Sequence, residues 1–143
     1  MAKFVRDLIA KKGDTIFKVA PQDSVRTAIE QMAERGVGAL LVMEDEKLRG
    51  IVSERDYARQ VILKGRNSQD TPVSDIMTSR VVCVDPERTI EECMALMTER
   101  RIRHLPVVVE SRVTGVISIG DVVSAVIAEQ EFQIKQLESY ISG

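Results

Sequence analysis

The apolar and polar positions of the chain repeat one arrangement of predicted elements. Each copy opens with a short apolar run, Thr15–Val19 or Arg80–Val84, which is typical of a strand and is ended by a proline. A segment with helical spacing comes next, and two apolar runs separated by a short polar loop then predict a pair of adjacent strands. A second helical segment closes each copy. The pattern therefore predicts the element order β-α-β-β-α twice.

The helix after each first strand has the clearest boundaries. In the first copy Asp23 or Ser24 can cap its N-terminus, and Gly36 can end it. Its apolar positions, expected in the core, recur at helical spacing in both copies: Val25, Ala28, Ile29 and Met32, then Ile90, Cys93, Met94 and Met97. The predicted strand pairs are Ala39–Met43 with Lys47–Val52, and Leu105–Val109 with Val113–Ile117. The closing helix of the first copy is predicted from Arg55 to Leu63.

An internal duplication explains the two copies. A shift of 65 positions aligns residues 15–62 with residues 80–127 without a gap, and 12 of those 48 positions are identical. One unit of about fifty residues that exposes a sheet face is marginal alone, so we expect the two copies to pack sheet against sheet. The predicted fold is mixed α and β (α+β), with two β-α-β-β-α repeats related by a pseudo-two-fold axis.

Helices are predicted at both ends of the chain. A short N-terminal helix carries an apolar face, can close at Gly13, and is expected to serve packing; the face consists of Phe4, Val5, Leu8 and Ile9. The last helix continues into a tail whose apolar positions follow four- and three-residue intervals: Val123, Ile127, Ile134, Leu137 and Ile141, with Gln130 in the gap. This heptad-like pattern predicts that the tail meets its twin in a homodimer or packs on the N-terminal helix.

These elements predict five segments along the chain. They are 1–14 (N-terminal helix and lead-in), 15–65 (repeat 1), 66–79 (linker and short helix), 80–128 (repeat 2) and 129–143 (C-terminal helical tail).

Composition and charge limit the function classes. With 20 basic and 22 acidic residues, the net charge is -2, and no basic stretch carries interleaved aromatics, so nucleic acid is not expected as a partner. No apolar run has the length of a signal peptide or a membrane span, which predicts a cytoplasmic protein without a membrane partner. Cys83 and Cys93, with a single histidine, are too few for a zinc site and are expected to be core thiols.

One short pattern stands at the end of the last strand in both copies. Gly50–Asp56 and Gly115–Asp121 each read glycine, two aliphatics, serine, two free positions and aspartate, which predicts a strand-to-helix corner. The first N–H groups of a helix favour an anion, phosphate above all, and an aspartate can accept hydrogen bonds from ribose hydroxyls. Serine and aspartate are also ordinary helix caps, but two copies in one register favour binding.

These corners, together with the run Arg101–Val108, resemble the CBS (cystathionine β-synthase) domain family. The chain looks like a stand-alone tandem pair, often called a Bateman module, and the resemblance covers nearly everything from Val5 to Ile127. Ser53–Arg59 is similar to small bacterial-type signalling members. The resemblance implies a non-enzymatic sensor with two clefts between the repeats, which hold AMP, ADP, ATP, NAD or S-adenosylmethionine in different members. An unknown regulated protein would be the further partner.

In this family each cleft combines the corner of one repeat with the residues before the second strand of the other. The first implied cleft contains Ser53, Arg55, Asp56, Arg103, His104, Leu105, Pro106, Thr15, Ile16 and Phe17. The second contains Ser118, Asp121, Gly38, Ala39, Leu40, Arg80, Val81 and Val82. Arg55 and Arg103 can contact phosphate in the first cleft, whereas Arg80 is the only cation named for the second, so we expect the first to bind a phosphorylated adenosine ligand more tightly. The family's common proline in the second strand is Pro106 in one copy and Leu41 in the other.

Two other function classes stay open. A nucleotide-converting enzyme would need phosphate-loop or metal-binding motifs that the sequence lacks, and no nucleophile is placed by sequence beside His104. A structural dimerisation module without a physiological ligand would suit the apolar tail, but it would leave Asp56 and Asp121 without a role. Calorimetric titration with AMP, ATP and NAD, combined with a product assay, separates the three classes.

Overall fold

The helices and strands group into two units that do not follow the order of the chain. The computed structural model describes residues 2–142. The repeat 1 unit is Ile16–Val81, and the repeat 2 unit combines Met1–Thr15 with Val82–Gly143. The N-terminal segment therefore belongs with the second repeat, although it precedes the first. The mixed α and β class predicted from the sequence is confirmed.

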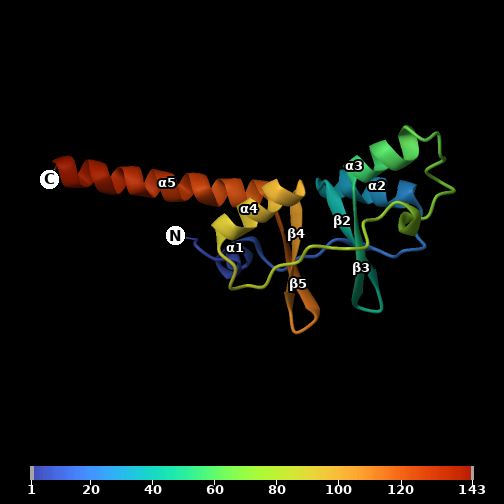
Figure 1. Ribbon diagram of the computed structural model, residues 1–143, viewed down its shortest axis with the longest axis horizontal. Helices are drawn as coiled ribbons and strands as arrows, with labels where there is room; N and C mark the ends of the chain where they lie inside the picture. Colours follow the sequence, from blue (N-terminus) through green and yellow to red (C-terminus); the bar gives the residue numbers. More distant parts are fainter. Residues whose placement is uncertain (1, 143) are drawn as a thin grey trace. The chain divides into compact units, whose positions relative to one another are not determined.

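The repeat 1 unit is built on a three-stranded sheet of order β1-β2-β3, of which Figure 1 labels β2 and β3. β1 (Lys18–Val19) is parallel to β2 (Ala39–Glu44), which is antiparallel to β3 (Lys47–Ser53). α2 (Val25–Arg35) joins β1 to β2, and Ser24 rather than Asp23 caps it, because the Oγ atom of Ser24 accepts the N–H of Thr27 at 3.1 Å. Gly36 ends α2 in the left-handed region, with a φ of 66°.

The helical segment after β3 is less regular than the sequence predicts. α3 (Glu54–Tyr57) leads directly into the π-helical turn η1 (Ala58–Ile62), and the 3₁₀ turn η2 (Val73–Asp75) follows after a linker. The N–H of Leu63 donates to the carbonyl of Ala58 at 3.1 Å, five residues back, which is the widened spacing of a π turn. This turn places Val61 in the core at 1% exposure and leaves Leu63 at 79%.

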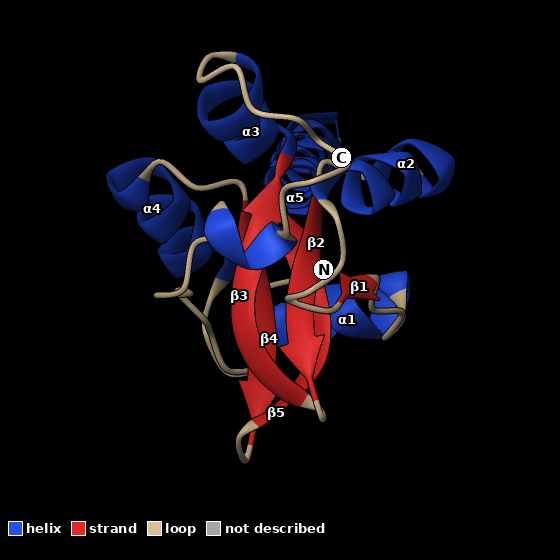
Figure 2. Ribbon diagram, turned by 90° about the vertical axis from the view of Figure 1, so that its right-hand side faces the viewer, coloured by secondary structure: helices blue, strands red, loops and turns tan. Residues whose placement is uncertain are grey.

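The repeat 2 unit is built on a two-stranded hairpin with three helices around it. β4 (His104–Val109) pairs with β5 (Arg112–Ser118), α1 (Val5–Lys12) contacts β5, and α4 (Ile90–Arg100) contacts β4. α5 (Ile119–Ser142) begins directly after β5 and extends away from both strands (Figure 1). Figure 2 shows that the tight loop between β4 and β5 lies at the opposite end of the hairpin from the start of α5.

A proline explains why the predicted first strand of the second repeat is absent. In repeat 1, the N–H of Leu41 donates to the carbonyl of Phe17 at 3.1 Å and helps to align β1 with β2. The residue 65 positions later is Pro106, which has no N–H to donate. Only an isolated bridge between Val84 and Val107 remains, so the strand predicted over residues 80–84 is wrong.

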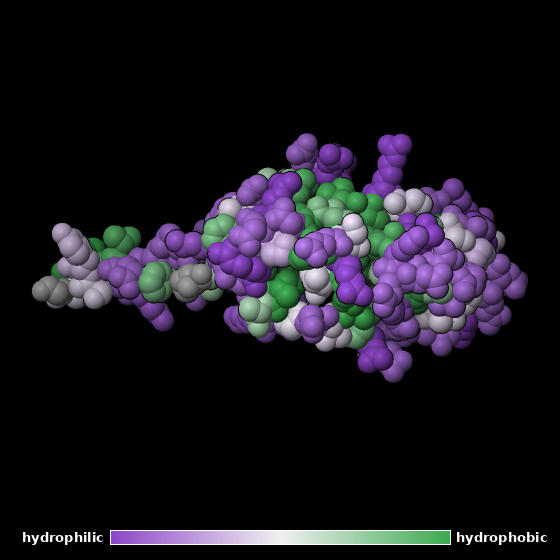
Figure 3. Space-filling view, turned by 90° about the horizontal axis from the view of Figure 1, so that it is seen from below, coloured by the Kyte–Doolittle hydropathy of each residue, from purple (hydrophilic) through white to green (hydrophobic). Residues whose placement is uncertain are grey.

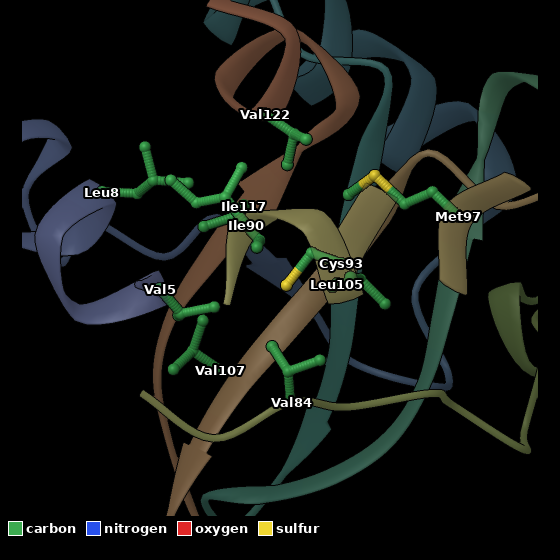
Figure 4. Close-up of a cluster of buried hydrophobic side chains, with 10 residues drawn as sticks. All are labelled: Val5, Leu8, Val84, Ile90, Cys93, Met97, Leu105, Val107, Ile117 and Val122. Atoms are coloured by element: carbon green, nitrogen blue, oxygen red, sulfur yellow. The ribbon is translucent and has the colours of Figure 1, made fainter. Parts of the chain in front are cut away.

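The cores of the two units are separate clusters. Figure 4 shows the repeat 2 core, to which α1 contributes Val5 and Leu8, so its predicted packing role is confirmed. Cys93 is fully buried there, and burial raises its pKa to about 11, whereas Cys83 is only partly buried. The repeat 1 core is made of these buried residues: Val19, Val25, Ala28, Met32, Leu40, Val42, Val52, Val61, Val73 and Ile76.

Each corner glycine leaves room for the segment that precedes the other repeat. A Cβ atom on Gly115 would lie 2.6 Å from the Cδ1 atom of Ile9 in α1. A Cβ atom on Gly50 would lie 2.7 Å from the Sδ atom of Met77 and 2.8 Å from the carbonyl oxygen of Thr78. These close approaches explain why the repeated pattern begins with glycine, since a side chain at either position would meet the covering segment.

Candidate functional site

The corner of repeat 1 is a reciprocal cap between Ser53 and Asp56. The Oδ2 atom of Asp56 accepts the backbone N–H of Ser53 at 2.9 Å and the Ser53 hydroxyl at 3.0 Å. In return, the N–H of Asp56 donates to the Ser53 Oγ atom at 3.2 Å. This capping box fixes both side chains at the start of α3, and both are partly buried.

The corner of repeat 2 has the same reciprocal cap and one additional contact, from a lysine side chain. The Oδ2 atom of Asp121 accepts the N–H of Ser118 at 2.7 Å, and the N–H of Asp121 donates to the Ser118 Oγ atom at 3.2 Å. The Nζ atom of Lys12 donates to the same Oδ2 atom at 2.6 Å and to the carbonyl of Val116 at 2.8 Å. Lys12 reaches the corner from the last turn of α1, which is packed on β5.

Charges at this second corner shift two pKa values. Burial alone would raise the pKa of Asp121, but the hydrogen bonds from Lys12 and from the Ser118 backbone outweigh it and hold the pKa below its usual 3.8. Burial, and after it the Lys12 charge, lower the pKa of His104 below 6.5, while Asp121 acts in the opposite direction. The corner is therefore an ionised pair beside a histidine that favours its neutral form.

Each corner also lies next to the residues that precede the second strand of its own repeat. In repeat 1, Ala39 pairs with Ser53, and the N–H of Glu54 donates to the Gly38 carbonyl at 3.0 Å. In repeat 2, His104 pairs with Ser118 in register, and the N–H of Ile119 donates to the Arg103 carbonyl at 2.8 Å. Within each unit, Arg103 and His104 thus lie beside the Asp121 corner, and Gly38 and Ala39 lie beside the Asp56 corner. The crossed combination implied by the family resemblance stays a prediction.

The remaining predicted residues differ in what they can present to a ligand. Leu40, Leu105 and Pro106 are buried, so their side chains belong to the cores and only their backbone could contact a ligand. Ile16, Val81 and Val82 are partly buried, and so is Phe17, whose ring lies 5.2 Å from the guanidinium carbon of Arg35. Thr15, Arg55, Arg80 and Arg103 are exposed.

A pocket of about 330 Å³ opens beside the repeat 1 corner. Its lining combines four apolar side chains with Gly38 and with Glu54, the residue that starts α3. The complete lining is Ile29, Met32, Ala33, Gly36, Val37, Gly38 and Glu54.

Lys12 is the site residue that sequence reasoning missed. The second corner was expected to have Arg80 as its only nearby cation, and that expectation is wrong because Lys12 bonds directly to Asp121. No local pattern could have identified it, since the two residues are 109 positions apart. The indirect signal was Gly115, whose missing side chain allows α1 to pack on β5.

The described residues show neither a metal-ligand cluster nor a membrane-spanning helix. Within residues 2–142, no group of three or more histidine, cysteine, aspartate or glutamate side chains is placed to hold a metal ion. None of the helices in that range has both the length and the apolar content needed to cross a membrane.

Comparison with known proteins identifies relatives that share the duplicated architecture. The mitochondrial CBS domain-containing protein CBSX3 of Arabidopsis thaliana is 44% identical over 126 residues, which cover 85% of this chain and 61% of the relative. The CBS domain-containing protein YhcV of Bacillus subtilis is 34% identical over 103 residues, covering 72% of this chain and 73% of YhcV. The chain thus spans less than two thirds of the Arabidopsis protein.

Solved structures and a family match agree with these relatives. A candidate signal-transduction protein with CBS domains from Burkholderia ambifaria is 50% identical, with a TM-score of 0.85 over 90% of this chain and 96% of that one. The CBS domain protein PAE2072 from Pyrobaculum aerophilum, solved in complex with AMP, shares the fold with 21% identity and a TM-score of 0.74, over 82% of this chain and 88% of that one. The CBS domain family matches residues 5–62 and 73–128. The chain therefore belongs to the CBS domain family and carries a tandem pair of its domains.

Proposed function

We propose that this chain is a non-enzymatic regulatory module that binds an adenosine nucleotide, AMP, ATP or NAD, at its two strand-to-helix corners. The observation that carries the proposal is the repetition of one geometry, because Asp56 and Asp121 accept the N–H of Ser53 and Ser118 at 2.9 and 2.7 Å with the same oxygen, Oδ2. The other oxygen of each carboxylate, Oδ1, can accept hydrogen bonds from ribose hydroxyls. The AMP complex of PAE2072 is a precedent within the same fold.

Local polarity supports a ligand with both a base and a phosphate. The pocket beside Glu54 has apolar side chains in its lining, including Ile29 and Val37, and these could contact the face of an adenine ring. Arg55 lies within the repeat 1 corner and Arg103 directly precedes β4, and their guanidinium groups suit phosphate oxygens. The serine and aspartate side chains are committed to capping bonds, which fits binding better than nucleophilic chemistry.

A calorimetric titration with AMP, ATP and NAD, run with a chromatographic assay for products, tests this function. We expect binding without conversion, and we expect Asp56→Asn and Asp121→Asn each to weaken it. Asp45→Asn is the matched control, because Asp45 lies in the exposed loop between β2 and β3, away from the corner. Turnover of a bound nucleotide would contradict a non-enzymatic role, and the absence of binding by all three ligands would refute the sensor.

We propose further that the module acts on another protein, because a ligand sensor needs an output, and a neighbour of 50% identity is described as a signal-transduction protein with CBS domains. A pull-down from extract with and without AMP tests this step. An identical set of captured proteins in both conditions would speak against a nucleotide-dependent partner. The cytoplasmic location expected from the sequence stays a prediction.

We also propose that the chain forms a homodimer through α5. Every residue from Gln130 to Ser142 is exposed, and a helix of that length without tertiary contacts is marginal in water. Apolar side chains occur along it, including Ile134 at 54%, Leu137 at 62% and Ile141 at 81% exposure. The space-filling view shows apolar (green) atoms among polar ones on the projecting end of α5 (Figure 3).

The polar residues of the tail favour a parallel pair of copies. If Ile134, Leu137 and Ile141 form the seam, Glu131 and Glu138 take equivalent flanking positions. An antiparallel pair would place these two glutamates against each other, whereas a parallel pair places Gln133 of one copy beside Glu138 of the other. A parallel pair also brings the two Gln130 side chains together, where their amides can bond and fix the register.

A further inference from the structure

Lys12 and Asp121 form an ion pair at the corner of the repeat 2 unit. The Lys12 ammonium is held by two oxygens from different parts of the corner, Oδ2 of Asp121 at 2.6 Å and the carbonyl of Val116 at 2.8 Å. The Asp121 side chain is 25% exposed and that of Lys12 is 39% exposed. The pair therefore sits at the rim of the corner, where it is partly shielded from water and still open to a ligand.

The contact leaves both partners with capacity for a ligand. An ammonium has three N–H groups, and two of them are used by Asp121 and Val116. The Asp121 contacts use Oδ2, so Oδ1 can still accept from a ribose hydroxyl. Lys12 thus compensates the charge of the carboxylate without blocking it.

Charge compensation matters most for a ligand that carries phosphate. An isolated aspartate at the corner would attract ribose hydroxyls but repel a phosphate bound to the same ribose, because the two anions lie within a few ångströms. With Lys12 in place, the pair is neutral overall, and the remaining N–H of the ammonium can donate to a phosphate oxygen.

We propose that Lys12 is a specificity-determining residue of the Asp121 corner, which makes that corner prefer phosphorylated adenosine over adenosine itself. This inference rests on the proposed function and names the ligand class of one of its two sites. Within residues 2–142, the Asp56 carboxylate of the repeat 1 corner bonds to Ser53 alone, whereas Asp121 bonds to Ser118 and also to Lys12. The contribution of Lys12 is thus confined to the Asp121 corner, and it comes from a helix outside the second repeat.

The test compares AMP with adenosine by calorimetry in chains that also carry Asp56→Ala, which confines the readout to the Asp121 corner. We expect Lys12→Gln to weaken AMP binding by about tenfold and to change adenosine binding by less than about twofold. Lys12→Arg keeps the charge and should keep the preference. Lys11→Gln is the matched control, because Lys11 precedes Lys12 in α1 and is exposed.

The outcomes separate this inference from the proposed function. If the Asp56→Ala parent binds AMP and Lys12→Gln weakens AMP and adenosine equally, or neither, Lys12 has only a structural role and the inference is overturned. If the parent binds neither ligand, ligand binding at this corner is refuted, and the role of Lys12 with it. Thermal unfolding of each variant shows whether it is folded. If Lys12→Gln is unfolded, the ratio of AMP to adenosine affinity in Lys12→Arg decides whether the charge at this position sets the preference.

Discussion

The Nζ atom of Lys12 lies 2.6 Å from the Oδ2 atom of Asp121, although the two residues are 109 positions apart in the chain. This ion pair connects the end of α1 to the start of α5, and so it links the N-terminal segment to the corner of the second repeat. Its consequences for stability, for the pKa of a neighbouring residue and for ligand choice can each be measured separately.

Lys12→Gln should lower the free energy of unfolding by about 1 kcal/mol at neutral pH, at the upper end of the range for exposed ion pairs because Asp121 is partly buried. The pKa of Asp121 is lower in the folded protein than the ordinary 3.8, so its pairing stabilises the fold above 3.8 and is lost as the pH falls through the folded value. Urea unfolding across this pH range should show that the difference in unfolding free energy between the wild-type chain and Lys12→Gln decreases as the pH falls. A constant difference would show that packing, and not charge, is what the substitution removes.

The pKa of His104 should respond to both members of this ion pair, and removal of each charge should shift it in the opposite direction. Burial lowers this pKa below 6.5, the Lys12 charge lowers it further, and the Asp121 charge raises it. Lys12→Gln should therefore move the pKa of His104 upward, and Asp121→Asn should move it downward. Because His104 is the single histidine of the chain, an NMR titration of its ring protons is unambiguous. Shifts of equal sign in both variants would contradict the arrangement of charges described here.

Stability should also depend on the protonation of this histidine. With a folded pKa below the unfolded one, His104 contributes stability that is fully present above 6.5 and is lost as the pH falls toward the folded value, because the unfolded chain then binds the proton more tightly. His104→Gln should remove this part of the pH dependence of the unfolding free energy measured with urea. If the pH dependence is unchanged, it comes from other titratable groups.

The two corner glycines should tolerate alanine unequally. At Gly50 a new Cβ would lie 2.8 Å from the backbone oxygen of Thr78, which cannot move without disturbing its bonds to Ile51. At Gly115 it would lie 2.6 Å from the terminal Cδ1 atom of Ile9, which can rotate away. Gly50→Ala should therefore cost about 1–3 kcal/mol in unfolding free energy, and Gly115→Ala clearly less. Equal costs in urea unfolding would mean that α1 is as rigidly held as the backbone of Thr78.

Sequence periodicity predicted the elements whose signals are local. Helix α2 begins at its Ser24 cap and ends at Gly36, as expected, because capping and the left-handed conformation are encoded by the residues themselves. The missing strand over residues 80–84 could also have been predicted, since Pro106 lacks the N–H that Leu41 uses. The π turn of η1 has no comparable mark, because a widened turn depends on how Val61 reaches the core.

The candidate site also has a local part that the sequence predicted and a tertiary part that it did not. Repetition of the serine and aspartate spacing located both corners, because a capping box is a contact between residues three apart. The spacing could not reveal Lys12, because this residue lies on α1, which precedes repeat 1 in the chain but belongs to the repeat 2 unit. The charge of a corner is therefore a tertiary property, even where its hydrogen bonds are local.

The exposed tail of α5 should carry the self-association of the chain. Burial of Leu137 against a second copy is worth about 1.5–3 kcal/mol, so Leu137→Glu should weaken dimerisation by about tenfold or more in sedimentation equilibrium. Gln136→Glu adds the same charge one position away from the seam and should leave the dimer intact, which makes it the matched control. Since residues 130–142 are exposed throughout, their amide hydrogens should exchange more rapidly in the Leu137→Glu variant than in the wild-type chain, because the helix loses its partner and frays. A wild-type chain that sediments as a monomer at high concentration would refute the dimer, and equal effects of the two substitutions would mean that the apolar seam is not the interface.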